Sequence, residues 1–365
     1  MKRYCALLLL GALLLQLWGC GAQTPAEERE TAETAAVTEA ETEAPTVRET
    51  EPVPEEPMYL KVSSITFSLA GDSEDIYMGL VPREKITWES EDPNVISVEN
   101  GVLTANSVGT TTIRASCGDR QLECTASCLA ETEEELKSLD PELLRKPKRM
   151  VPDVELDSPC TFYDNAVLVG DSISLMMIQN ESKGNYLGDL LVLARNGTSL
   201  CGLVNRFKNI YYQACEMNLE DAIAKSQVDR MYILLGANDI ACEPNRLAYF
   251  DNWDTMLARL RDKTPDLEIV VISNTPKCKT TKNSVGNKFA KYNAMVKEDN
   301  AKLEQYCSEH GCQYLNLAYY IEDHEGNMAL EYNLDGDHMN DVGYLQWIKL
   351  MRLYAEYELA GGKIS

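Results

Sequence analysis

Short apolar runs separated by amphipathic segments dominate the second half of the chain. Five runs have the length and β-branched content of buried strands, at residues 166–169, 190–194, 231–235, 267–272 and 313–317. Helix-like segments lie between or after them, so the pattern predicts an α/β fold in which a parallel sheet has helices on both faces. We expect the last helix to begin after Asn340, a good N-cap, and to end before Gly361 and Gly362. Its apolar positions at helical spacing are expected in the core: Val342, Leu345, Ile348, Ala355 and Leu359.

Residues 58–129 show the alternation of a half-buried sheet instead. Apolar and β-branched residues alternate with polar ones in several short runs, and Asn100-Gly101 is one of the turn signals between them. The runs are 62–69, 86–88, 95–98, 102–105 and 110–115. This spacing predicts a small all-β sandwich. The order of strands, turns and glycines from Ile86 to Ile113 resembles the group 2 bacterial immunoglobulin-like domain, whose members usually act as spacers or adhesive modules in surface proteins.

The amino terminus has the pattern of a targeting segment. Lys2 and Arg3 precede an apolar run at residues 6–15, which is too short to span a bilayer as a helix. The run ends in Leu17-Trp18-Gly19-Cys20, which resembles the lipobox of bacterial lipoproteins. That resemblance implies a signal segment at 1–20, a lipidated Cys20 and a lipid anchor in the cell membrane. An ordinary secretory signal with an incidental cysteine is the alternative.

Two segments have the composition of connectors. Residues 21–57 contain eleven Glu and no aromatic residue, so they cannot bury enough apolar surface to fold. We expect a disordered tether there, either a spacer through cell-wall polymer or a solubilising tail. Residues 130–160 mix charge with four prolines and are expected to form a linker, or a strap packed on the next domain.

Charge and cysteine spacing limit the classes of protein. The chain has 34 Lys and Arg residues and 58 Asp and Glu residues, which gives a formal net charge of −24. Nucleic-acid binding draws its affinity from clustered cations, so we expect no nucleic-acid partner. No cysteines stand in the CxxC pairs of zinc or redox sites, and we expect no metal and no cofactor. Cys117, Cys124 and Cys128 can be a disulfide plus one thiol or buried thiols, and Cys307 could pair with Cys312.

Polar motifs follow several of the predicted strands. Ligands bind beyond the carboxyl ends of strands in such folds, and Gly170-Asp171-Ser172, Asn196-Gly197 and 236–239 (Gly-Ala-Asn-Asp) follow the first three. Of the three histidines, His310 ends a charged helix and His324 is expected in an acidic surface loop. His338 stands three residues after Asp335, which can orient its ring. A serine, a base, an orienting carboxylate and oxyanion donors are what acyl transfer requires.

These blocks together resemble the SGNH hydrolases, also called the GDSL family of esterases and lipases. The resemblance covers about residues 161–360 and implies a flavodoxin-like three-layer α/β/α sandwich with a five-stranded parallel sheet. It implies Ser172 as nucleophile, with Asp335 and His338 as its catalytic partners. The backbone of Ser172, the backbone of Gly197 and the side chain of Asn238 would form the oxyanion hole, although Gly197 fits an ordinary turn as well.

The resemblance and the amino terminus together suggest a surface-anchored serine esterase. We expect an ester substrate, in particular an acetylated cell-wall glycan or other polysaccharide, and an acyl-serine intermediate. Tyr211-Tyr212 and Tyr319-Tyr320 could stack on sugars, although aromatic pairs are more often core. Two alternatives stay open: an O-acyltransferase on the same fold, and a non-catalytic glycan-binding surface lipoprotein.

Overall fold

The computed structural model describes residues 57–158, 160–206, 209–280 and 288–363. The predicted signal segment with Cys20, and the predicted tether apart from its last residue, lie outside these residues. Within them, no helix has both the length and the apolar character needed to cross a membrane.

The second half of the described chain is built on a five-stranded parallel sheet. Its strands are β11 (Ala166–Gly170), β12 (Leu191–Ala194), β15 (Arg230–Leu234), β16 (Glu268–Ile272) and β17 (Gln313–Leu315). Their order in the sheet is β12-β11-β15-β16-β17, and every neighbouring pair is parallel. This is the 2-1-3-4-5 order of flavodoxin-like sheets. All five predicted strands are confirmed to within one or two residues at each end.

Helices cover both faces of this sheet. Along β11, Leu168 packs with the cluster of α3 (Ser172–Gly184) and α11 (Asp341–Leu359). The neighbouring Val167 and Val169 pack on the opposite side. That side is covered by α4 (Leu200–Val204), α5 (Leu219–Ser226), α8 (Tyr249–Lys263) and the second half of α9 (Lys288–Glu309). The predicted three-layer α/β/α arrangement is therefore confirmed.

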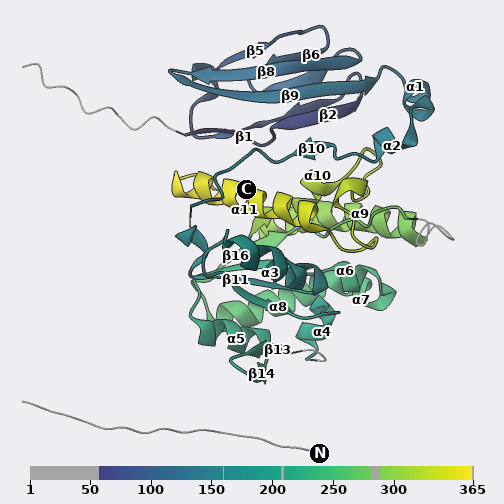
Figure 1. Ribbon diagram of the computed structural model, residues 1–365. Coiled ribbons are helices and arrows are strands. Elements are labelled where there is room, and N and C mark those ends of the chain that lie inside the picture. The colour runs from purple at the N-terminus through teal and green to yellow at the C-terminus, as the bar shows by residue number, and fades with distance from the viewer. Residues whose placement is uncertain (1–56, 159, 207–208, 281–287, 364–365) are drawn as a thin grey trace, which may run out of the picture. The chain divides into compact units, whose positions relative to one another are not determined.

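The last helix begins where the sequence predicts. The side chain of Asn340 accepts hydrogen bonds from the backbone N–H groups of Val342 and Gly343, and the chain turns at Gly361 with φ 95°. The prediction of its core face is partly wrong, because Val342 and Leu359 are 43% and 73% exposed in the terminal turns. The buried residues include Tyr344, Trp347, Ile348, Leu350, Met351 and Leu353. They surround much of the helix, because α11 lies between the sheet and the N-terminal module (Figure 1).

The N-terminal module is a β-sandwich, as expected. One sheet has the order β10-β2-β9-β8-β5 and the other β3-β7-β6, with β1 and β4 paired beside them. Their bounds are β1 (Met58–Leu60), β2 (Ser64–Leu69), β3 (Ser73–Asp75), β4 (Tyr77–Gly79), β5 (Thr87–Ser90), β6 (Ile96–Glu99), β7 (Val102–Ala105), β8 (Gly109–Cys117), β9 (Arg120–Ala130) and β10 (Arg149–Met150). The sequence patterns missed β9, whose inward positions hold small residues and thiols. Cys124 and Cys128 are buried free thiols, and burial raises the pKa of Cys124 to about 12.

The predicted linker is a strap that touches both halves of the molecule. It carries the short helices α1 (Glu133–Ser138) and α2 (Pro141–Leu144) and then β10, whose Arg149 is in register with Ile65 of β2. The Arg149 guanidinium lies 2.9 Å from Glu74 of the sandwich and 3.4 Å from Glu322 of the α/β half. It also stacks 3.8 Å above the centre of the Tyr319 ring.

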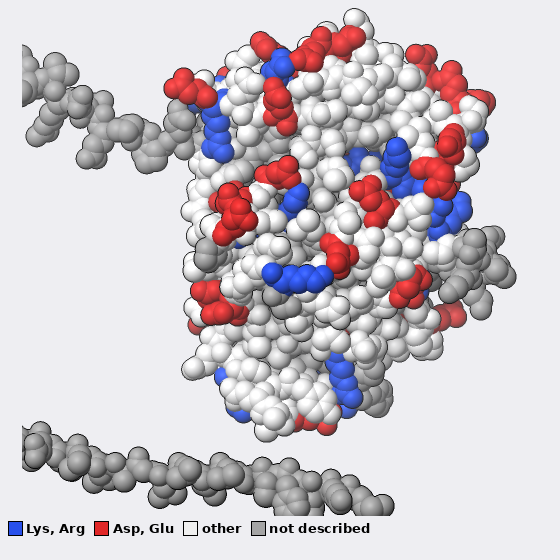
Figure 2. All heavy atoms as spheres, viewed as in Figure 1, with Lys and Arg blue, Asp and Glu red and all other residues white. Residues whose placement is uncertain are grey.

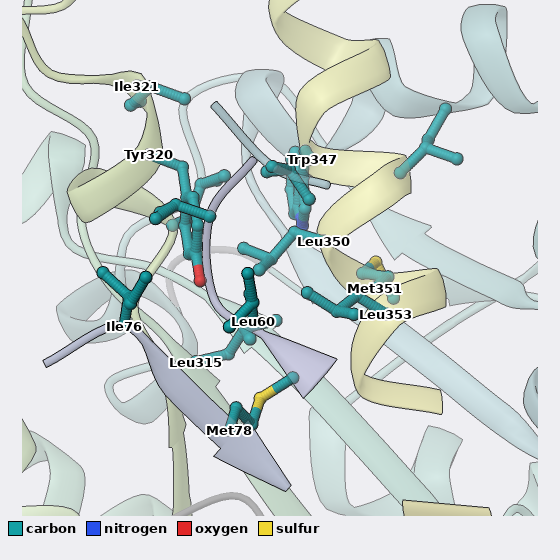
Figure 3. Packing of buried hydrophobic residues seen from close by; sticks show 14 of the residues in the cluster. Leu60, Ile76, Met78, Leu315, Tyr320, Ile321, Trp347, Leu350, Met351 and Leu353 are labelled. Atoms are coloured by element: carbon teal, nitrogen blue, oxygen red, sulfur yellow. The ribbon is translucent and has the colours of Figure 1, made fainter. Parts of the chain in front are cut away.

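The sandwich and the α/β half share one hydrophobic cluster. Leu60, Ile76 and Met78 from the sandwich belong to the same cluster as Tyr320 and Leu350, and Figure 3 shows the two sets side by side. All five side chains are less than 10% exposed. The two halves therefore pack as parts of one body.

Candidate active site

Ser172 stands at the junction of β11 and α3. The preceding Gly170 leaves no room for a side chain, because a Cβ there would lie 2.0 Å from Ser174 Oγ and 3.0 Å from the Leu234 carbonyl oxygen. The strand therefore passes close to β15 and turns directly into the helix. This places Ser172 at a helix amino terminus, where free N–H groups favour negative charge on a bound oxygen.

The structure brings Ser172, His338 and Asp335 together. Ser172 Oγ lies 2.9 Å from His338 Nε2, and His338 Nδ1 lies 2.9 Å from Asp335 Oδ2. The three side chains thus form one hydrogen-bonded chain, although Ser172 and His338 are 166 positions apart in the sequence. The distances fit a base that accepts the serine proton and a carboxylate that orients the imidazole.

Asp335 is fixed by the loop that it belongs to. Its Oδ1 accepts hydrogen bonds from the backbone N–H groups of Asp337 (3.0 Å) and His338 (2.9 Å). Burial alone would raise the pKa of Asp335, but the hydrogen bonds from His338 and Asp337 hold that pKa below its usual range. Asp337 does not compete for the imidazole in this structure, because its Oδ1 lies 2.9 Å from Lys277 Nζ.

Asn238 lies on the short helix α6 (Ala237–Ile240), directly after β15. Its Nδ2 donates to Asp171 Oδ2 (3.0 Å) and to the Thr198 carbonyl oxygen (2.8 Å). The side chain therefore ties together the three loops that follow β11, β12 and β15. An oxyanion bound by this amide would have to share or replace one of these acceptors.

Gly197 lies on the turn after β12. Its φ of 67° is in the left-handed region that glycine favours, and the Thr198 N–H closes the turn by donating to the Arg195 carbonyl (3.1 Å). The turn reaches the site through the contact of Thr198 with Asn238. Gly197 itself is not among the described residues that line the cavity at Ser172. Its role as an oxyanion donor stays a prediction.

The two aspartates next to the motif residues support the loops, as expected. Asp171 accepts from the Ile173 N–H (2.9 Å), and Asp239 accepts from the Leu200 and Cys201 N–H groups at the start of α4 (2.8 and 2.9 Å). Burial raises the pKa of each of these carboxyls to about 6.

A cavity of about 250 Å³ opens at Ser172 and His338. Its other lining residues are Asp171, Ile173, Ala237, Asn238, Ala241, Thr275, Lys277, Tyr292 and Asp337. Thr275 and Lys277 come from the loop after β16 and were missed by the sequence analysis. The rule that chemistry follows strand ends would have found them at the fourth strand, as it found residues at the first three.

The other two histidines lie away from this cavity. His310 is at the end of α9, as predicted, where its Nδ1 lies 2.8 Å from the Tyr306 carbonyl oxygen. His324 lies in an acidic turn between Asp323 and Glu325, but its side chain is half-buried, with Nδ1 2.9 Å from Ser68 Oγ of the sandwich. Burial there, with Lys148 and Arg149 nearby, lowers the pKa of His324 to about 4.

The predictions for the tyrosine pairs and for the cysteine pair have different outcomes. Tyr211 is 56% exposed beside Arg195, whereas Tyr320 is 3% exposed and belongs to the core. Cys307 and Cys312 are free thiols in this structure, so the suggested pair is not formed.

A flavodoxin-like sheet with a hydrogen-bonded serine, histidine and aspartate at its carboxyl edge is an arrangement that serine hydrolases use. Residues 168–345, which include all of these side chains, match the model of the GDSL-like Lipase/Acylhydrolase family. The match supports a GDSL-like lipase/acylhydrolase domain in this chain, and the family's description implies hydrolysis of acyl esters.

Several solved structures are similar to this chain over about half of its length. A GDSL-like lipase from Bacteroides thetaiotaomicron is 16% identical, with 56% of this chain and 92% of that chain covered and a TM-score of 0.43. A catalytic mutant of an acetylxylan esterase from Geobacillus stearothermophilus is 13% identical, with 52% and 93% covered and a TM-score of 0.34. A carbohydrate acetylesterase family member from Sinorhizobium meliloti is 15% identical, with 54% and 99% covered and a TM-score of 0.37. No curated protein matches the chain significantly.

Proposed function

We propose that this protein is a serine esterase that removes short acyl groups, in particular acetyl groups, from polysaccharides. The observation that carries the proposal is the chain of two 2.9 Å contacts from Ser172 through His338 to Asp335, at the wall of an open cavity. This geometry supports nucleophilic attack on an ester without rearrangement of the three side chains.

The reaction proceeds in two halves. His338 Nε2 takes the proton of Ser172 as Oγ forms a bond to the ester carbonyl carbon, and Asp335 stabilises the imidazolium. The negative charge on the carbonyl oxygen is stabilised by the Ser172 and Gly197 N–H groups and by Asn238. His338 then protonates the departing alcohol, which leaves an acyl-serine. Water then gives a proton to the same imidazole as its oxygen bonds to the acyl carbon. The bond from that carbon to Oγ breaks, the acid leaves, and His338 returns the proton to Ser172 Oγ.

The size and polarity of the cavity favour a small acyl group. Its volume of about 250 Å³ has to hold the reacting ester, and Asp171, Thr275, Lys277 and Asp337 contribute polar groups to its wall. A long acyl chain would need an extended apolar groove for burial. An acetyl group with a hydroxyl-rich alcohol fits this lining better.

In this proposal, the protein acts at the outer surface of a bacterial cell. Cys20, lipidated, would hold the protein on the membrane, and the acidic segment 21–57 would lift the folded part into the cell wall. The sandwich at 58–129 would belong to the immunoglobulin-like modules of surface proteins, and residues 161–360 would form the hydrolase domain. The partners are then the membrane and an acylated glycan.

Release of acetate from O-acetylated polysaccharides tests the proposal. The chain from residue 57 should release acetate from acetylated xylan or O-acetylated peptidoglycan, and Ser172→Ala at equal concentration should not. If acetate moves to an added acceptor sugar in preference to water, the protein is an acyltransferase. If the folded wild type binds such glycans but releases no acetate, it is a binding protein and the proposal is wrong.

A further inference from the structure

One charged pair in the cavity has no part in the proton transfers described above. Lys277 Nζ lies 2.9 Å from Asp337 Oδ1 and 4.5 Å from the centre of the Tyr292 ring. All three side chains line the same cavity as Ser172 and His338. The pair therefore borders the space beside Ser172 in which an ester would bind.

The main chain at Lys277 is held by hydrogen bonds that do not involve the charge of its side chain. The Lys277 N–H donates to Asn293 Oδ1 (2.8 Å), and Asn293 Nδ2 donates to the Lys277 carbonyl oxygen (2.9 Å). The next N–H, of Cys278, donates to the Gly336 carbonyl oxygen (2.9 Å) and so joins this loop to the Asp335 loop. The loop can keep its shape without the ammonium group.

The ion pair is accessible, which makes a purely stabilising role a weak explanation for it. The side chain of Lys277 is 26% exposed and that of Asp337 is 57% exposed. Ion pairs exposed to this degree contribute little to stability because water screens them. Accessible donors and acceptors at a cavity wall are available to a ligand instead.

The pair presents a donor and an acceptor side by side. An ammonium group has three donors and a carboxylate accepts at two oxygens, so the single contact between them leaves capacity on both. A hydroxyl group both donates and accepts, and the pair has no net charge to favour an anion. The Tyr292 ring beside the ammonium adds an apolar face, which suits the C–H face of a sugar ring.

From this geometry we propose that Lys277 and Asp337 form the subsite that recognises the hydroxyl groups of a neutral, sugar-like alcohol next to the scissile ester. The inference rests on the proposed esterase function and makes it more specific. Lys277 and Asp337 are specificity-determining residues in this account, and Ser172, His338 and Asp335 carry out the reaction.

The test compares two acetate esters that differ in hydroxyl groups. The substrates are a mono-O-acetylated methyl xylopyranoside and cyclohexyl acetate, and the enzymes are the wild type, Lys277→Met and Asp337→Asn. For the sugar ester we expect kcat/KM to fall by about tenfold to a hundredfold in each variant, mainly through KM, because hydrogen bonds to charged groups are lost. For cyclohexyl acetate we expect a clearly smaller decrease.

Lys279→Met is the matched control. Lys279 pairs with Glu325 at 3.2 Å two residues further along the same loop, and it is not among the described residues that line the cavity. This variant should keep the wild-type ratio of kcat/KM values for the two esters.

The possible failures are distinguishable. An equal decrease with both esters, or a loss confined to kcat, would mean that the pair only positions the His338 loop, and the inference would be wrong. Variants that keep the wild-type preference for the sugar ester would also overturn it while leaving the esterase function intact. A wild type without Ser172-dependent turnover of either ester would overturn both.

Discussion

At the scale of single residues, the site depends on a few polar side chains that are held from several directions. Asn238 contacts Asp171 and Thr198, and Asp335 is held by two N–H groups of its own loop. The sequence could indicate Ser172, Asp335 and His338 because their motif spacings carry chemical meaning. It could not indicate the pairing of Lys277 with Asp337 or the two hydrogen bonds of the Asn238 amide, because these depend on loop conformations that no spacing encodes.

Replacement of Asn238 should damage catalysis more than folding. We expect Asn238→Ala to lower kcat by about 10² to 10³, the usual loss for one oxyanion donor. Kinetics on 4-nitrophenyl acetate measure this, with the thermal midpoint of the variant as a control for folding. A kcat within threefold of wild type would mean that Asn238 only braces the loops.

The buried carboxyl group of Asp323 leads to a prediction of how folding stability depends on pH. It is 2% exposed and accepts N–H bonds from Glu325 (2.8 Å) and Asn327 (2.9 Å), and burial raises its pKa to about 6 from an ordinary value of 3.8. The folded state therefore holds this proton more tightly than the unfolded state. Its contribution to stability is complete below pH 4 and is lost as the pH rises to about 6.

Asp323→Asn removes that titration while keeping an acceptor oxygen in the turn. Urea unfolding at pH 4 and pH 7 should show that the wild type loses more stability over this interval than the variant, by at most about 3 kcal/mol. If the free energy of unfolding changes by the same amount in both proteins between these pH values, the raised pKa of Asp323 is contradicted.

At the scale of elements, strand patterns in the sequence were more informative than helix faces. All five strands of the parallel sheet were predictable because continuous apolar runs mark strands that are buried on both faces. The face of α11 was not, because burial between the sheet and the sandwich spreads its apolar residues around the helix. In the sandwich, β9 was missed because alanines and cysteines give a weak alternation.

The N-cap of α11 connects helix stability to the site. Asn340 Oδ1 caps the helix, and Nδ2 donates to the Glu331 carbonyl oxygen (2.8 Å) ahead of the Asp335 loop. We expect Asn340→Ala to lower the free energy of unfolding by about 1 to 2 kcal/mol. Asn340→Asp keeps the cap and loses only the donor, so chemical denaturation should place it between the wild type and Asn340→Ala. Equal stability of all three proteins would rule out the capping role.

At the scale of the whole molecule, the sandwich packs against the α/β half and is not a separately tethered domain. Leu60 and Ile76 share a cluster with residues of the helix that follows His338 (Figure 3). The strap carries Arg149, which lies between Glu74 and Glu322 of the two halves. Sequence patterns defined both modules but not this contact, since nothing local indicates which surfaces meet. On the face seen in Figure 2, Lys and Arg side chains are dispersed among Asp and Glu side chains.

Substitution of Arg149 tests the contact between the sandwich and the α/β half. Removing a buried cation leaves Glu74 and Glu322 without their partner, so Arg149→Met should lower the free energy of unfolding by about 3 kcal/mol. Arg114→Met is a control, because Arg114 pairs with Glu91 and Glu123 on the open surface of the sandwich, where water screens ion pairs, and the substitution should change stability much less than Arg149→Met. Equal effects of the two substitutions in chemical denaturation would mean that the Arg149 contact does not hold the halves together.

The central claim is that Ser172 is a nucleophile activated by His338. The most direct measurement is the turnover of 4-nitrophenyl acetate by the chain from residue 57, together with intact-mass analysis after exposure to a fluorophosphonate, in the wild type and in Ser172→Ala. The account predicts steady turnover and a single phosphonyl adduct on Ser172 in the wild type, and neither in the variant. Turnover and labelling that persist in Ser172→Ala, or a folded wild type that shows neither, would contradict it.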